Sequence, residues 1–158
     1  MKRHILRTSL TIVLALTIRQ VEALGQNESH NSRRPHGIEG VWNESVTFRQ
    51  CDTGNATGTD HAMVMFIRGG TLVQAADHLA SPGLGTWRPL EEGRYTSIFQ
   101  LFRLNADGSL AGRSKATRDI ELNENAGEFT GTSVLEVFDA SDKLIFTVCA
   151  TETATRLD

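Results

Sequence analysis

The chain has 158 residues, of which 39% are apolar, 6% aromatic and 22% charged. This composition is too apolar for a disordered protein, and the apolar residues are too dispersed for several membrane-spanning helices. Sixteen basic and nineteen acidic residues give a formal charge of −3, which argues against a surface for nucleic acid. The length suits one domain with a real core. Two cysteines exclude a disulfide-dense scaffold and a four-thiolate zinc site.

Residues 1–23 have the pattern of a secretory signal peptide. A basic start, with Lys2, Arg3 and Arg7, precedes an uncharged apolar run over residues 10–18 that is too short to cross a bilayer. Val21 and Ala23 supply the small side chains that a signal peptidase reads, so we expect cleavage after Ala23. An amphipathic helix or a short anchor is the alternative. We therefore expect a secreted or periplasmic protein without a membrane anchor.

The remaining chain divides into a leader and one domain. Residues 24–36 are polar and aperiodic, which predicts a flexible leader. From residue 37 to residue 158, apolar residues alternate with polar ones and short Gly/Asn/Asp clusters recur, as in all-β sandwiches and barrels. The predicted strands are Val41–Gln50, His61–Arg68, Thr71–Ala76, Gly85–Leu90, Arg94–Leu104, Ser109–Leu122, Glu128–Phe138 and Lys143–Thr153.

Eight sequential strands joined mostly by hairpin turns favour an antiparallel up-and-down barrel, because closure removes the two exposed sheet edges. At the end where the first strand starts, all predicted turns are short. The opposite end carries two long loops, at residues 52–60 and 77–84. This asymmetry predicts a monomeric cup with one closed end and one end whose loops act as a lid.

The two cysteines are expected to pair in an oxidising compartment. Cys51 ends the first predicted strand and Cys149 lies in the last, and these two strands are neighbours in a closed barrel. A register that sets Cys51 opposite Cys149 also sets Glu44 opposite Arg156, with Trp42 one diagonal step away. The alternative is that both thiols are free and buried.

The segment Gly40-Val41-Trp42, which opens the first strand, resembles the lipocalins and the wider calycin group of fatty-acid-binding proteins and avidins. The resemblance implies an eight-stranded barrel in which the first-strand tryptophan stacks beneath an arginine near the C-terminus. Trp42 and Arg156 match that pair. With Trp87 as the only other tryptophan, the chain has too few for a biotin site. Residues 69–87 also resemble secreted bacterial proteins of this general kind.

The alternation within two strands identifies side chains that point into the barrel. Ser114 and Arg118 fall on the apolar face of 109–122, and Ser133 on that of 128–138. Small inward residues leave space for a ligand, whereas an inward guanidinium needs a partner. Three alternatives for Arg118 remain open. It stabilises the barrel by pairing with an internal carboxylate or carbonyl groups, or it binds the acid group of an amphipathic ligand, as the resemblance to fatty-acid-binding barrels implies. In the third alternative, a β-bulge turns it outward.

Three functions remain open from the sequence. The first is binding of a small apolar, amphipathic or acidic ligand by candidate residues Arg118, Ser114, Ser133, Tyr95 and Trp87. The second is a scaffold with a filled interior that binds partners through its long loops. The third is a barrel-type cyclase or isomerase, which needs at least two polar groups converging with His61, His78 or Arg118. The sequence shows no catalytic motif, metal-ligand spacing or cofactor signature, so we expect a binding protein rather than an enzyme.

Overall fold

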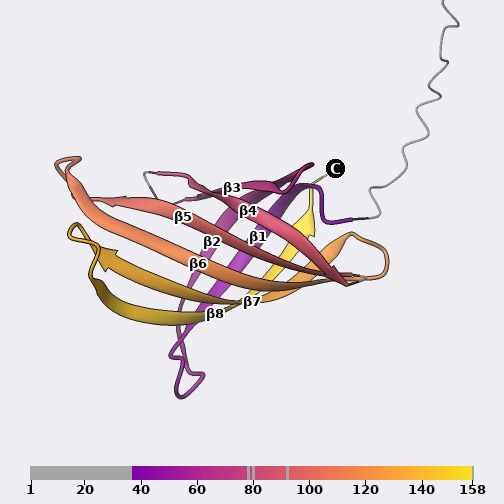
Figure 1. Cartoon of the computed structure of the whole chain (residues 1–158). Helices are drawn as coiled ribbons and strands as arrows, with labels where there is room; N and C mark the ends of the chain where they lie inside the picture. Colours follow the sequence, from indigo (N-terminus) through magenta and orange to yellow (C-terminus); the bar gives the residue numbers. More distant parts are fainter. Residues whose placement is uncertain (1–36, 78, 80, 92, 158) are drawn as a thin grey trace, which may run out of the picture. The chain divides into compact units, whose positions relative to one another are not determined.

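The computed structural model describes residues 37–157 except 78, 80 and 92. Eight strands form one closed antiparallel barrel in sequence order, which confirms the predicted up-and-down architecture (Figure 1). The strands are β1 (Gly40–Arg49), β2 (Ala56–Ile67), β3 (Thr71–Ala76), β4 (Gly83–Glu91), β5 (Arg94–Leu104), β6 (Leu110–Leu122), β7 (Glu128–Asp139) and β8 (Leu144–Arg156). The predicted signal peptide and leader lie outside the described residues. Within the described part of the chain, no helix is long and apolar enough to span a bilayer.

β2 and β8 extend furthest beyond the ends that their sequence patterns predict. β2 begins at Ala56 rather than His61, because its first residues pair with β1 as far as Arg49 although they lack apolar alternation. β8 continues to Arg156, which pairs with Trp42 of β1. Backbone hydrogen bonding to a neighbouring strand extends both elements beyond the part that the apolar pattern marks.

Aromatic side chains fill one end of the barrel. Trp42 meets Phe129 edge-on with ring centroids 5.0 Å apart, and Phe66 lies 6.2 Å from Phe129. Trp87 extends the cluster, with centroid distances of 6.1 Å to Phe66 and 5.9 Å to Tyr95. Edge-on aromatic contacts of this kind pack densely and exclude water. The end at which β1 starts is therefore closed.

Arg156 covers the closed end of the barrel, on the outer side of the aromatic cluster. Its guanidinium carbon lies 4.1 Å from the centroid of the Trp42 ring, and Nη2 donates to the carbonyl of Gly37 at 2.7 Å. Nε donates to the carbonyl of Ala126 at 2.8 Å. Gly40 adopts a φ of +131°, and a Cβ there would lie 2.7 Å from Arg156 Nη1. The glycine of the Gly-x-Trp segment therefore leaves the space that the arginine side chain occupies.

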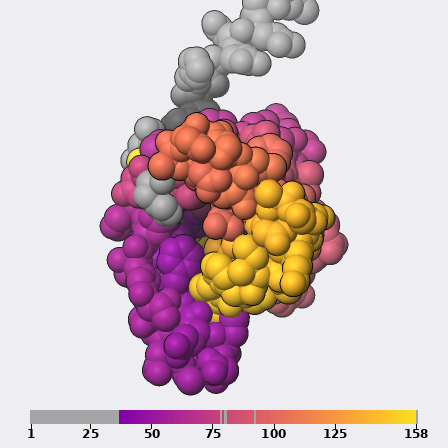
Figure 2. All heavy atoms as spheres, turned by 90° about the vertical axis from the view of Figure 1, so that its left-hand side faces the viewer, coloured from indigo at the N-terminus to yellow at the C-terminus, as the bar shows by residue number. Residues whose placement is uncertain are grey.

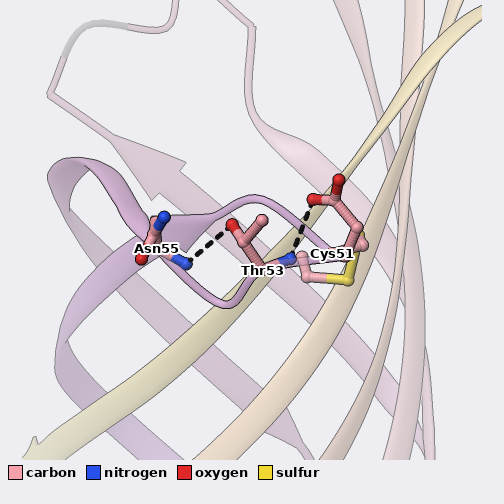
Figure 3. The surroundings of a disulfide bond; sticks show 5 residues. Cys51, Thr53 and Asn55 are labelled. Atoms are coloured by element: carbon pink, nitrogen blue, oxygen red, sulfur yellow. Dashed lines mark hydrogen bonds between the residues drawn. A yellow bond between two sulfur atoms is a disulfide. The ribbon is translucent and has the colours of Figure 1, made fainter.

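The disulfide between Cys51 and Cys149 is present, with the Cα atoms 5.0 Å apart. The predicted register is wrong by two residues, because Trp42 rather than Glu44 stands opposite Arg156 and Arg49 stands opposite Cys149. β1 ends at Arg49, so Cys51 belongs to the following turn and reaches Cys149 diagonally. Figure 3 shows this turn, in which the backbone N–H of Thr53 donates to Asp52 Oδ1 at 2.8 Å. A shift of two residues preserves which side chains face inward.

Candidate functional site

A cavity of about 360 Å³ occupies the half of the barrel away from the aromatic cluster. Its walls come from the ends of β1, β3, β5 and β7 and the starts of β2, β6 and β8, so it opens where the long loops lie. Figure 2 faces this end and shows a hollow bordered by the β1–β2 segment in purple, the β5–β6 turn in orange and the β7–β8 turn in yellow. The polar and charged lining residues among those that the structure describes are Thr57, Asp60, Gln74, Arg103, Ser114, Arg118, Ser133 and Glu152.

Most of the cavity wall is apolar. Its larger apolar members are Val46, Phe48, Phe99, Leu101, Leu135, Val137, Phe146 and Val148. Phe146 lies near the mouth and is half exposed, whereas Phe99 and Val137 are buried. An apolar hollow with a few polar groups is the usual composition of a small-molecule site in proteins.

A buried polar cluster lies on the cavity wall around Arg118. Its Nη2 donates to Glu44 Oε2 at 3.1 Å and to Gln74 Oε1 at 2.5 Å, and its Nε lies 3.3 Å from Glu152 Oε2. Gln74 Nε2 also donates to Glu44 Oε2, at 3.2 Å. One face of the guanidinium lies on the ring of Phe99, 4.6 Å from its centroid. Four strands, β1, β3, β6 and β8, each contribute one polar member.

The cluster is removed from water, with Arg118 and Glu44 each 1% exposed and Glu152 3% exposed. Burial raises the pKa of Glu44 from its ordinary value of 4.5 to about 7; the neighbouring charge of Arg118 lowers it and that of Glu152 raises it. Several polar atoms of the cluster have no hydrogen-bond partner within the described protein, among them Glu44 Oε1, Arg118 Nη1 and the nearby Ser97 Oγ. Such atoms carry a desolvation cost that a bound group or a shared proton relieves.

The structure brings together some of the sequence-predicted ligand-binding residues and separates others. Arg118, Ser114 and Ser133 line the cavity. Trp87 and Tyr95 are not among its lining residues, because both pack into the aromatic cluster at the closed end. Trp87 Nε1 donates to the carbonyl of Ile67 at 3.0 Å.

Of the two Asp-His pairs, Asp60 lines the cavity, whereas Asp77 and His61 are not among its lining residues. His61 is an exposed residue of β2 and stands opposite Ser45, and His78 lies outside the described residues. Among the residues that the structure describes, no three His, Cys, Asp or Glu side chains form a group that could hold a metal ion.

Sequence reasoning missed Glu44, Gln74 and Glu152 as partners of Arg118. Glu44 lies two residues after Trp42, and Glu152 stands between Ala150 and Ala154, which are both buried. Alternation along β1 and β8 therefore carried a signal for inward carboxylates. The structure adds that both carboxylates reach the same guanidinium from different strands.

Comparison with protein-family models, with curated proteins and with solved structures finds no match to this chain. The site alone therefore carries the functional argument.

Proposed function

We propose that this chain is an exported, lipocalin-like binding protein that holds a small apolar or amphipathic molecule inside the barrel. The cavity of about 360 Å³, with apolar walls and a buried polar cluster on one side, is the observation that carries the proposal. Its size lies within the range of roughly 300–1,000 Å³ common for small-molecule sites. A filled interior, as a pure scaffold would have, does not fit this hollow.

The lipocalin-like character of the proposal draws on the closed end of the barrel. Trp42 and Arg156 form the stacked pair that the family resemblance implies, and Gly40 leaves room for the arginine. The disulfide supports the proposal that the protein is exported, because paired cysteines persist mainly in oxidising compartments. Both features suit a stable extracellular or periplasmic carrier.

The proposal is tested with a probe whose fluorescence rises in apolar surroundings, N-phenyl-1-naphthylamine, titrated into the protein. We expect saturable binding at a stoichiometry of about one probe per chain. Ser114→Phe places a large side chain on the cavity wall and should weaken binding at least about tenfold. Thr117→Phe, on the exposed face of the same strand, is the matched control and should bind as the unaltered protein does. Absence of saturable binding, or equal binding by both variants, contradicts the proposal.

Acid–base catalysis is a second candidate, favoured by one specific observation. Three polar side chains converge on Arg118, and one of them, Glu44, has a pKa raised to about 7, which suits a group that exchanges protons near neutral pH. Glu44 is, however, not among the cavity-lining residues, so its carboxyl group is set behind Arg118 rather than presented to a substrate. We therefore rank binding first. Turnover of a bound ligand that Glu44→Gln abolishes, without loss of binding, would reverse this order.

A further inference from the structure

The charges of the buried polar cluster on the cavity wall are not balanced. Two carboxyl groups, those of Glu44 and Glu152, face the guanidinium of Arg118. With all three groups ionised, the cluster carries one excess negative charge. In a site shielded from water, that excess attracts a cation and repels an anion.

The guanidinium of Arg118 is also poorly placed to receive an acid. A carboxylate binds arginine most strongly through two parallel hydrogen bonds to adjacent nitrogens. Nε already faces Glu152 and Nη2 already donates to Glu44 and Gln74. Each pair of adjacent nitrogens therefore includes one that a protein group has taken, and Nη1 is itself enclosed. A ligand carboxylate would have to displace a buried protein carboxylate.

We propose that the polar end of the bound ligand is a cation of the alkylammonium type, held beside Glu152 at the cavity wall while its apolar body lies against the hydrophobic lining. This inference rests on the proposed binding function and specifies the class of ligand. An ammonium group has N–H donors and one positive charge, which match Glu152 Oε2, a buried acceptor with no hydrogen-bond partner in the described protein, and the excess negative charge of the cluster. Glu152 is the carboxyl group of the cluster that lines the cavity.

Proton exchange supports the same assignment. Burial holds the pKa of Glu44 at about 7, so near neutral pH a proton on this carboxyl group can cancel the excess charge of the empty site. The charged group facing Glu44 from β6 is Arg118 and the one from β8 is Glu152, while β3 contributes the neutral Gln74. A bound cation supplies the positive charge that the proton on Glu44 supplies in its absence. Binding should therefore release a proton from Glu44 and strengthen as the pH rises through about 7.

The experiment compares three ligands of equal chain length, octylamine, octan-1-ol and octanoate, as competitors of N-phenyl-1-naphthylamine at neutral pH and low ionic strength. We expect octylamine to displace the probe at a concentration about tenfold lower than octanol, and octanoate at one about tenfold higher. Calorimetry in two buffers of different ionisation enthalpy should show proton release on binding of octylamine and none on binding of octanol.

Glu152→Gln removes the excess charge and should bring the octylamine and octanol affinities to within about threefold of each other. Glu121→Gln makes the same change of charge at an exposed position of β6 and should leave the preference unchanged. Thermal unfolding of each variant verifies that it is folded; if Glu152→Gln is not, proton release by the unaltered protein decides the question.

The outcomes separate the two proposals. Displacement of the probe by octanoate at or below the octanol concentration, or no advantage of octylamine over octanol, overturns the cationic assignment while leaving ligand binding intact. Failure of all three ligands and of the probe to bind overturns the proposed function itself.

Discussion

The buried carboxyl group of Glu44 makes the stability of this barrel depend on pH in an unusual direction. Its pKa is about 7 in the folded protein against an ordinary value of 4.5, so between these values the folded state holds a proton that the unfolded chain has lost. The free energy of unfolding therefore falls as the pH rises through this window. At about 1.4 kcal/mol per pKa unit, the total loss is about 3 kcal/mol, most of it between about pH 5 and pH 8.

Glu44→Gln should remove this dependence, because an amide mimics the protonated carboxyl group and cannot ionise. We expect the variant to match the unaltered protein near pH 5 and to exceed it by about 2–3 kcal/mol near pH 8. Urea unfolding at constant ionic strength measures the effect as a midpoint that moves by about 1–2 M in the unaltered protein and little in the variant. Glu121→Gln, which changes the same charge on the barrel exterior, should keep the full dependence. A Glu44→Gln variant that keeps this pH dependence, or an unaltered protein that becomes more stable towards pH 8, would refute the reasoning.

Two further predictions concern the covalent and polar closure of the barrel. The disulfide joins residues 98 positions apart, and restricting an unfolded loop of that size stabilises the fold by about 4–5 kcal/mol. The double variant Cys51→Ser with Cys149→Ser should therefore lose about that much free energy of unfolding, measured by urea unfolding. An unchanged urea midpoint would contradict this prediction. Arg156→Ala leaves the carbonyls of Gly37 and Ala126 without their donor and uncovers Trp42, so we expect a loss of about 4 kcal/mol. Tryptophan fluorescence during unfolding measures this loss, and a loss below about 1 kcal/mol would show that Arg156 is dispensable.

Much of the fold was open to prediction from local pattern. Period-two alternation identifies strands, and Gly/Asn/Asp clusters identify the turns between them, because both reflect the conformations that single residues prefer. The positions of Ser114, Arg118 and Ser133 inside the barrel followed from the same alternation. The pairing of Cys51 with Cys149 followed from adjacency of the first and last strands in a closed barrel.

The extent of pairing and the register were not predictable in this way. β2 gains its first residues by hydrogen bonding to β1, and this backbone contribution leaves no mark in side-chain hydrophobicity. The register of β1 against β8 was set by Trp42 opposite Arg156, whereas the disulfide reaches across from a turn. A turn residue can bridge diagonally, so the cysteines constrained the register only to within two residues.

The sequence by itself determined an all-β chain whose strands expose one face to a common interior and whose first and last strands meet. Only the tertiary structure decided that Glu44, Gln74 and Glu152 converge on Arg118, and that Trp87 and Tyr95 fill the closed end instead of lining the cavity. The reason is geometric: alternation fixes whether a side chain points inward, but its height along the barrel axis and its partners across the interior depend on register, strand tilt and closure.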